Sequence, residues 1–553
     1  MKENYSRDKS SLLLVQIGPV QDFITAARTV GDLWSGSYFI AYLTANGIKY
    51  VAEQPDCKII FPCLENQQVY QRLSEHSLKL GQPTLPNRFC AEVPCEKALE
   101  IARGVEKAIK DKLQDISQKC FEKFLQLLPD SGKNYKTRWD NQMEKFLQIS
   151  WQTVPLDKSN WGISYGDLLK NLAARRNTRN FEQITSDDCP TSAYKDALNG
   201  KDEIVGDIEE WKKVLCDSKS PFTRDDRPYG AINFIKRVWS DCYLHANGVE
   251  KTSAKELTEE SNGEAEKYIA AIQMDGDHMG SILGAAHPTA DFFTRFSRKL
   301  ANFTREKAGT IIEKHKGVLV YAGGDDVLAL LPACEAVACA RDLREAFCAN
   351  DPNMPGSEKE LGNDIKKVTL SAGISFCHYK TPLSLLIQHA RSAEHRAKEH
   401  YRRDALALSI FKRSGEILLW GAKFDSPAWQ LFQKFAEFER KDVLSNRFAN
   451  ALASYLKQYK LEELTVADIE LFKNIITADF AHVCENQKRT QKQDNQADLS
   501  EFTSLAEKYL SELAQKSQAS IKESPKKTQI VMDEFAKLFL AVNFLIRKGD
   551  DNE

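Results

Sequence analysis

The sequence lacks three features that would place a protein of this length in a class at once. It has no apolar run of about 18 residues and no cleavage-site pattern behind its short apolar stretch, Leu12 to Ile17, which argues against membrane spans and signal peptides. It has no dominant charge, since 76 basic and 78 acidic residues leave a net charge of −2, so any RNA contact must come from a local patch or from partners. It has no Cys-x-x-Cys pair among its 13 cysteines, which argues against a structural zinc site and for reduced core thiols. We therefore expect a cytoplasmic, multidomain protein with no membrane contact.

The strongest local signal is the segment 317–332, in which the apolar runs Val318–Tyr321 and Val327–Leu331 flank Gly323-Gly324-Asp325-Asp326. Gly-Gly supplies the positive φ angles of a two-residue hairpin turn, and the flanking branched and aromatic residues favour paired strands. Adjacent carboxylates at the tip repel each other unless a cation lies between them, and a hard ion such as Mg²⁺ or Mn²⁺ takes oxygen ligands together with substrate phosphates. The pattern indicates either a metal site for nucleotide chemistry or a solvated acidic turn.

The segments around this hairpin follow the order strand, helix, strand, strand, helix, strand. Tyr268–Met274 predicts a strand that ends in Asp275-Gly276-Asp277, and a long helical pattern separates it from the hairpin. A helix over Cys334–Phe347 and a strand over Val368–Phe376 complete the ferredoxin-like order, which brings the end of the first strand beside the hairpin. Asp275 would then face the two hairpin carboxylates, an arrangement that suits Mg²⁺ bridging a triphosphate and an attacking hydroxyl.

The N-terminal part also opens as an α/β unit. Ser11–Ile17 predicts a strand, Val20–Arg28 a helix, Gly31–Tyr38 a loop of small residues and Phe39–Val51 a second helix. The loop either admits a ligand or lets helices pack closely, since Gly and Ser permit both.

Two basic features have two interpretations each. Lys398 lies on a helix predicted over Pro382–His400 and either reaches phosphates or stays in solvent. Arg175, Arg176 and Arg179 lie within one helical turn, and they either meet phosphates or pair with acids on a solvated face.

Composition and periodicity predict an α/β plus α chain of four parts. They are an N-terminal α/β domain (1–170), a polar region with Cys189, Cys216 and Cys242 (171–264), the α/β domain with the hairpin (265–420) and a C-terminal helical domain (421–553).

Four motifs, in this order, resemble those of one protein family. They are Gly18-Pro19-Val20-Gln21-Asp22-Phe23-Ile24, Asp32-Leu33-Trp34-Ser35-Gly36-Ser37, Asp275-Gly276-Asp277-His278-Met279-Gly280 and Gly323-Gly324-Asp325-Asp326. From residue 11 to about 415, the chain resembles the large polymerase-like subunit of type III CRISPR effector complexes, which act in antiviral defence. It is most similar to the Cmr (III-B) branch.

The resemblance implies two ferredoxin-like palm domains that face each other, the first (1–170) without an acidic motif and the second (265–420) with Gly-Gly-Asp-Asp. It also implies a zinc-finger-like insertion and a C-terminal helical domain that docks small subunits. The implied partners are other Cmr-type subunits, a guide crRNA and a target RNA. When the complex pairs with target RNA, the palms of the family join ATP units into cyclic oligoadenylate, or some relatives join AMP to S-adenosylmethionine.

The resemblance also assigns roles to residues. The implied catalytic carboxylates and metal ligands are Asp275, Asp325 and Asp326, with Asp277 as a further metal ligand. The implied nucleotide-binding residues are Gly323, Gly324, Lys398, Ser371, Asp32 and Ser37.

Two departures from the family pattern matter. Many relatives begin with an HD nuclease domain, whereas the palm-like strand here starts by residue 11 with no His-Asp pair before it, so we predict no DNA cleavage by this subunit. Ser192 stands where relatives have the partner of Cys189, so we predict a zinc-finger-like region without zinc.

These patterns favour an Mg²⁺-dependent nucleotidyltransferase with ATP as substrate, in which no protein general base is apparent. One alternative is a non-catalytic scaffold that anchors guide RNA and small subunits, although crowded, unpaired acids argue against it. Another is a stand-alone cyclic-dinucleotide synthase of the GGDEF type, which shares the palm order but not the long N-terminal resemblance.

Overall fold

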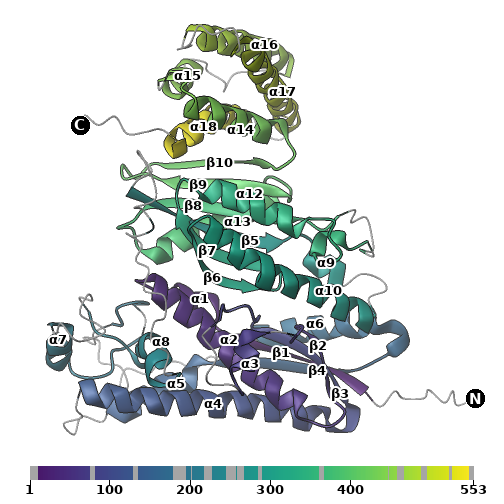
Figure 1. Cartoon of the computed structure of the whole chain (residues 1–553), viewed down its shortest axis with the longest axis vertical. Helices are drawn as coiled ribbons and strands as arrows, with labels where there is room; N and C mark the ends of the chain where they lie inside the picture. The colour runs from purple at the N-terminus through teal and green to yellow at the C-terminus, as the bar shows by residue number, and fades with distance from the viewer. Residues whose placement is uncertain are drawn as a thin grey trace, which may run out of the picture.

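The computed structural model arranges the chain in three tiers along its longest axis (Figure 1). The described residues are 10–65, 67–74, 81–128, 135–178, 195–200, 202–216, 227–244, 257, 267–283, 289–359, 361, 367–445, 447–457, 466–486, 495–521 and 526–546. A four-stranded sheet with its helices forms the lower tier, a six-stranded sheet forms the middle tier, and a group of helices forms the upper tier.

The first sheet has the ferredoxin-like strand order β2-β3-β1-β4 and is antiparallel throughout. Its strands are β1 (Ser10–Gly18), β2 (Lys58–Phe61), β3 (Arg88–Pro94) and β4 (Gln148–Pro155). Side chains of β1 alternate between two cores, as the two-residue period of a strand requires. Leu13 and Val15 pack with the helices of the lower tier, whereas Leu12 and Leu14 pack in the core that continues into the middle tier.

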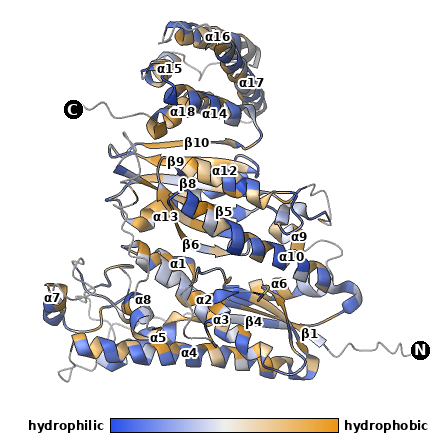
Figure 2. Ribbon diagram, viewed as in Figure 1, coloured by the Kyte–Doolittle hydropathy of each residue, from blue (hydrophilic) through white to orange (hydrophobic). Residues whose placement is uncertain are grey.

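Two helices of the lower tier, α2 (Val30–Ala52) and α4 (Ala98–Leu127), cover one face of this sheet, and other helices pack with them in the same core. Those others are α1 (Gln21–Thr25), α3 (Gln68–Gln71), α5 (Tyr135–Phe146), α7 (Ile208–Cys216) and α8 (Ala231–Cys242). Hydrophobic and hydrophilic residues alternate along α4 at helical spacing (Figure 2), so its apolar stripe faces the core. A further helix, α6 (Trp161–Asn177), packs Trp161 against Phe293 of the middle tier, with ring centroids 4.3 Å apart and ring planes tilted by 50°.

One local expectation was wrong here, because Gly31–Tyr38 is not a loop but part of α2. Thr29 caps the helix: its side chain accepts a hydrogen bond from the backbone N–H of Asp32, and the Asp32 side chain accepts one from the backbone N–H of Thr29. This capping box starts the helix at Val30, and the small residues that follow allow close packing. The helix predicted from Val20 is also shorter, since α1 ends at Thr25.

The region between the two sheets contributes to the first core. Trp211 of α7 and Phe234 and Trp239 of α8 are buried among the helices of the lower tier. Cys189 and Ser192, on which the zinc-finger prediction depends, lie outside the described residues, as does Arg179. The domain limits 171–264 therefore stay a prediction.

The second sheet confirms the predicted ferredoxin-like order and extends it. Its order is β10-β9-β8-β5-β7-β6, in which β8-β5-β7-β6 is the ferredoxin-like part and β9 adds in parallel to β8. The strands are β5 (Tyr268–Gly276), β6 (Val318–Gly323), β7 (Asp326–Pro332), β8 (Leu370–His378), β9 (Ala405–Phe411) and β10 (Ile417–Lys423). The strand β10 was not predicted. Figure 2 colours β9 and β10 largely hydrophobic, and their buried residues share a core with the helices of the upper tier.

Helices cover both faces of the second sheet. Those in its larger core are α9 (Met279–Leu283), α10 (Ala290–Asn302), a π-helical turn (Phe303–Ala308), α11 (Gly309–Lys314) and α12 (Ala336–Phe347). The opposite face is covered by α13 (Leu383–Glu399). Ile24 of α1 and Leu33 of α2 pack in that same smaller core, so the first palm is docked on the α13 side of the second.

The upper tier is helical and continues the core of the second sheet. It contains α14 (Pro427–Arg440), α15 (Phe448–Leu456), α16 (Val466–Asn486), α17 (Asn495–Ile521) and α18 (Lys526–Ile546). Phe435, Phe448, Phe502 and Phe539 form its aromatic centre, with ring centroids 5.0 to 6.5 Å apart. Among the described helices, none is long and apolar enough to cross a membrane.

Candidate functional site

The Gly-Gly-Asp-Asp segment forms the predicted two-residue turn between β6 and β7. Gly323 and Asp326 are the last paired residues of the two strands. Gly324 has a φ of 68°, in the region that glycine adopts without strain. Gly323 is needed for a different reason, since a Cβ there would lie 2.0 Å from the hydroxyl of Tyr321.

The turn packs against the end of β5, as the strand order predicts. β5 pairs with β7 up to Met274 opposite Val327, which leaves Asp275 and Gly276 beside the turn. A Cβ on Gly276 would lie only 2.8 Å from the Cβ of Asp325, so glycine allows the two backbones this approach. The structure therefore brings the ends of three strands together with Asp275, Asp325 and Asp326. We call this place the acidic edge.

The two turn carboxylates carry uncompensated charge. Burial, together with the charge of Asp326, raises the pKa of Asp325 to about 7. Burial raises the pKa of Asp326 to about 6, against the lowering effect of Arg391 and Arg88. A divalent cation bound beside these two acids would lower both pKa values and keep both carboxylates ionised.

Lys398 provides a positive charge at this end of the sheet, where its partner is Asp275. Its ammonium group contacts the Asp275 carboxylate and lies 3.0 Å from a carboxylate oxygen of Glu394. Burial lowers the pKa of Lys398 to about 8 and raises the pKa of Glu394 to about 7. Lys398 therefore lies at the acidic edge and not in solvent, and its phosphate contact stays a prediction.

Glu394 is a residue that the sequence reasoning missed. It lies on α13 four residues before Lys398, the spacing that places a Glu and a Lys side by side on a helix. That spacing was the available signal. The helix is held close to β8 because Gly373 has no side chain: a Cβ there would lie 2.0 Å from the backbone nitrogen of Glu394.

Asp277 and Ser371 form a buried structural connection. Asp277 accepts hydrogen bonds from the Ser371 hydroxyl (2.7 Å), the Thr369 hydroxyl (2.8 Å) and the backbone N–H of Asp404 (2.9 Å). These three bonds use both carboxylate oxygens and join the ends of β5, β8 and β9. A metal or nucleotide contact by either residue would compete with them.

Asp32 and Ser37 lie inside the first palm and not at the acidic edge. Asp32 is buried and pairs with Arg237 of α8, with Nε to Oδ1 at 2.6 Å and Nη2 to Oδ2 at 2.8 Å. Ser37 is buried within α2. On the same helix as Arg237, the buried Lys236 donates hydrogen bonds to the backbone carbonyls of Phe23, Ile24 and Ala26. These two basic residues, which sequence reasoning missed, fix the N-terminal motif.

Charged residues of the first palm also influence the acidic edge. Arg88, at the start of β3, opposes the rise in the pKa of both turn carboxylates. Asp22 of α1 opposes the lowering of the Arg391 pKa that burial causes. The backbone carbonyl of Pro83 accepts a hydrogen bond from the N–H of Ala322 in β6 at 3.3 Å. The candidate site is thus built at the contact between the two palms.

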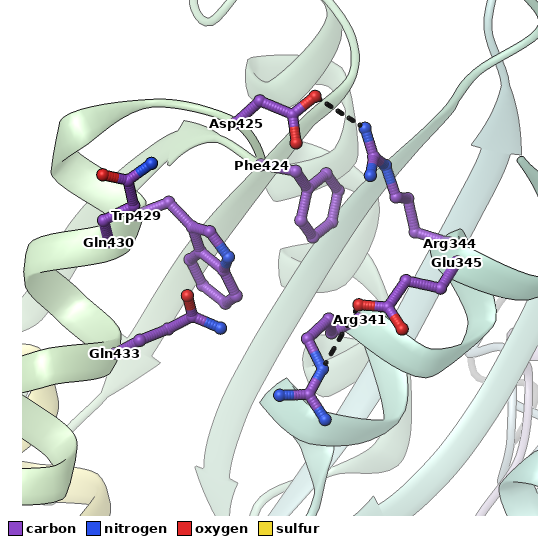
Figure 3. A pocket seen from close by; sticks show the side chains of 8 residues that line it. All are labelled: Arg341, Arg344, Glu345, Phe424, Asp425, Trp429, Gln430 and Gln433. Carbon is purple, nitrogen blue, oxygen red and sulfur yellow. Dashed lines mark hydrogen bonds and ion pairs between the residues drawn. The ribbon is translucent and has the colours of Figure 1, made fainter.

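A separate cavity of about 280 Å³ lies between α12 and α14 (Figure 3). Phe424 and Trp429 line it together with Arg344, whose guanidinium binds Asp404 at 2.8 Å and Asp425 at 3.2 Å. Arg341, which also lines the cavity, pairs with Asp342 and Glu345, so both arginines of the cavity already have acidic partners.

The described carboxylates do not by themselves complete a metal site. In the ranges that the structure describes, no three His, Cys, Asp or Glu side chains converge closely enough to hold a metal ion. The ion pair between Lys398 and Asp275 occupies one of the predicted ligands. The metal-ligand roles of Asp275, Asp325, Asp326 and Asp277 stay predictions.

Comparison with known proteins connects this site to a family. Residues 12–118 match the model of the N-terminal part of the CRISPR-associated protein Cmr2, and residues 268–407 match the model of the second palm domain of Cas10/Cmr2. Among curated proteins, the chain is similar to the CRISPR system Cmr subunit Cmr2 of Pyrococcus furiosus, at 23% identity over 79% of this chain and 65% of that protein. It is also 26% identical to the single-strand-specific deoxyribonuclease Cas10/Csm1 (subtype III-A) of Streptococcus thermophilus, over 37% of this chain and 26% of that protein. The chain thus spans about two thirds or less of the length of these relatives.

A solved structure shares the fold. A chain in the type III-B Cmr-beta complex bound to cognate target RNA superimposes with a TM-score of 0.62 at 13% identity, over 88% of this chain and 79% of that one. The two family matches fall in the same order as the two sheets, the first from β1 into α4 and the second from β5 into β9. Both sheets of this chain therefore lie in regions that match models of Cas10/Cmr2 proteins, and these findings support a Cas10/Cmr2-type subunit.

Proposed function

We propose that this chain is the nucleotidyltransferase of a type III-B CRISPR complex, in which target RNA activates it to join AMP units from ATP. The products are adenylate second messengers, either cyclic oligoadenylate or AMP joined to S-adenosylmethionine. Its partners in this proposal are other Cmr-type subunits, a guide crRNA and a target RNA, as the name of the similar Cmr-beta structure suggests.

The observation that carries the proposal is the pair of turn carboxylates against the end of β5. Their raised pKa values mark charge that the surrounding residues do not balance. Acids crowded in this way destabilise a protein unless they serve a ligand, and perturbed carboxylates at a strand edge are typical of functional sites.

The donor set fits a divalent cation. Asp275, Asp325 and Asp326 offer only oxygen atoms, which are the ligands that Mg²⁺ and Mn²⁺ prefer. Bound there, the ion would stabilise charge on the α-phosphate and favour the ionised form of the attacking hydroxyl.

Lys398 has two successive partners in this proposal. Without nucleotide it neutralises Asp275, and with nucleotide it moves to the triphosphate, which frees the Asp275 carboxylate for the cation. Glu394 keeps the ammonium group beside the site in both states, since it lies 3.0 Å away on the same helix. The glycines of the turn let the phosphates approach the backbone.

Product analysis tests the proposal. The complex is assembled with guide and matching target RNA and supplied with ATP and Mg²⁺, with and without S-adenosylmethionine, and products are identified by mass spectrometry. We expect adenylate product from the wild type and none from the Asp325→Asn/Asp326→Asn double variant, with assembly unchanged. The matched control is Glu313→Gln, an exposed acid on α11 of the same palm, which should retain full activity. Product from the double variant at the wild-type rate would refute the assignment.

Cation binding is tested without activity. With ATP present to draw Lys398 from Asp275, Mg²⁺ or Mn²⁺ should raise the thermal unfolding midpoint of the wild type and of Glu313→Gln above that with ATP alone, because a ligand that binds the folded state stabilises it. The double variant should show no such increase.

One observation favours a second candidate function, a scaffold that anchors guide RNA and small subunits. Asp275 is already neutralised by Lys398 within the chain, as a purely structural acid would be. Normal assembly and target binding, without product and without a cation-dependent shift in the wild type, would favour the scaffold.

A further inference from the structure

Two cysteines far apart in the sequence lie side by side in the lower tier. The sulfur of Cys120 on α4 is 3.4 Å from the sulfur of Cys242 on α8, within hydrogen-bond distance for thiols. The two helices pack along each other in the first core. A disulfide would shorten this separation to about 2.0 Å.

The two thiols differ in accessibility. Cys120 is buried, whereas Cys242 is half-buried and lines a cavity of about 350 Å³. Lys119, Glu122 and Lys123 line the same cavity. Lys119 lies 4.0 Å from Glu122, whereas the charge of Lys123 favours the thiolate of Cys242. A small polar molecule can therefore reach one sulfur of the pair and not the other.

The two thiols also differ in acidity. The hydrogen bond from Cys120 lowers the pKa of Cys242, and Lys123 acts in the same direction. Burial raises the pKa of Cys120. An accessible thiol of low pKa beside a second, shielded thiol is the arrangement found in redox-reactive cysteine pairs.

We propose that Cys242 and Cys120 form an oxidation site in which a hydroperoxide converts the two thiols into a disulfide. The Cys242 thiolate attacks the terminal peroxide oxygen, the O–O bond breaks, and the leaving oxygen takes a proton to become water or an alcohol. The Cys120 thiol then attacks the resulting sulfenic acid, the S–S bond forms, and the sulfenic oxygen leaves as water with the Cys120 proton. The two sulfurs together lose two electrons, which the peroxide accepts.

The disulfide would join the helix that holds the N-terminal motif to the rest of the lower tier. Lys236 and Arg237, which hold the end of α1 and the start of α2, lie on the same helix as Cys242. Cross-linking α8 to α4 closes a long loop of the chain, so the oxidised form should unfold at a higher temperature. The proposal is independent of the nucleotidyltransferase assignment.

The test uses the full chain, hydrogen peroxide and non-reducing peptide mapping by mass spectrometry. We expect one Cys120–Cys242 cross-linked peptide that dithiothreitol removes. In Cys120→Ser, a dimedone probe should trap sulfenic acid at Cys242, and in Cys242→Ser neither product should form. With peroxide limiting, Cys242 should react faster than the exposed Cys216, because the lowered pKa of Cys242 increases the fraction of its reactive thiolate form.

Two outcomes would overturn the proposal. One is a wild-type chain in which both thiols remain free after peroxide has oxidised Cys216. The other is a Cys242 that reacts no faster than Cys216. Since both are read on the wild type, they hold even where a serine variant fails to fold, and Cys216→Ser serves as the matched control that should leave the cross-link unchanged.

Discussion

Replacing Gly373 with alanine should move α13 away from the second sheet and impair the acidic site. A Cβ at this position of β8 would lie 2.0 Å from the backbone nitrogen of Glu394 and 2.3 Å from the backbone oxygen of Ala390. Both are backbone atoms of α13, so no side-chain rotation relieves the clash. Real Cβ contacts begin near 3.0 Å, which requires the helix to retreat by about 1 Å.

The expected cost follows from this displacement. Overpacking of a buried contact costs about 1 to 3 kcal/mol, and each kcal/mol lowers the unfolding midpoint of a domain of this size by about 2 to 4 °C. Because α13 carries Glu394 and Lys398, a shift of about 1 Å at the site should lower the rate of adenylate formation about 100-fold. Thermal unfolding and product formation by the assembled complex measure the two effects.

The matched control is Gly309→Ala in the same palm. Its added Cβ would meet only the Leu319 side chain, at 3.9 Å, an ordinary contact. Since Gly309 begins α11 without a positive φ, alanine should stabilise the protein by about 0.5 to 1 kcal/mol and leave activity unchanged. A Gly373→Ala variant with the unfolding midpoint and product yield of the wild type would refute the reasoning.

Three further changes test individual contacts. Arg237→Met should destabilise the chain by about 3 to 5 kcal/mol, because it leaves the buried Asp32 carboxylate without its partner, and the double variant with Asp32→Asn should recover part of this loss in denaturant unfolding. Ser371→Ala should cost about 1.5 to 3 kcal/mol by removing a hydrogen bond to the buried Asp277, and a Ser371→Thr variant of equal stability to alanine would contradict that account. Burial would raise the pKa of Asp342, but hydrogen bonds from His315, Arg341 and Lys314 hold it at about 2, below the 3.8 of the unfolded chain. Its folded-state pKa is depressed, so its contribution of up to about 2 kcal/mol is present above pH 4 and is lost as the pH falls to about 2. Asp342→Asn should therefore lower the unfolding midpoint at pH 7 and much less near pH 2, as measured by unfolding at a series of pH values.

The sequence by itself determined the order of elements and the position of the acidic turn. Alternating or continuous apolar runs and Gly-Gly between them are local signals, and β5, β6, β7, β8 and α13 lie within a few residues of the predicted segments. The approach of the β5 end to the turn followed from the ferredoxin-like order alone. The start of α2 was missed because the Gly and Ser residues of the segment 31–38 are also typical of loops. The Thr29 and Asp32 capping box was nevertheless visible in the sequence.

Only the tertiary structure decided which partner each charged residue has. Lys398 pairs with Asp275, Asp277 holds Ser371 and the start of β9, Asp32 pairs with Arg237, and Cys120 meets Cys242. Every one of these contacts joins elements that are far apart in the chain. A periodic pattern reports which face of a helix or strand is buried, but which residue of another element meets that face depends on how the two sheets and their helices pack.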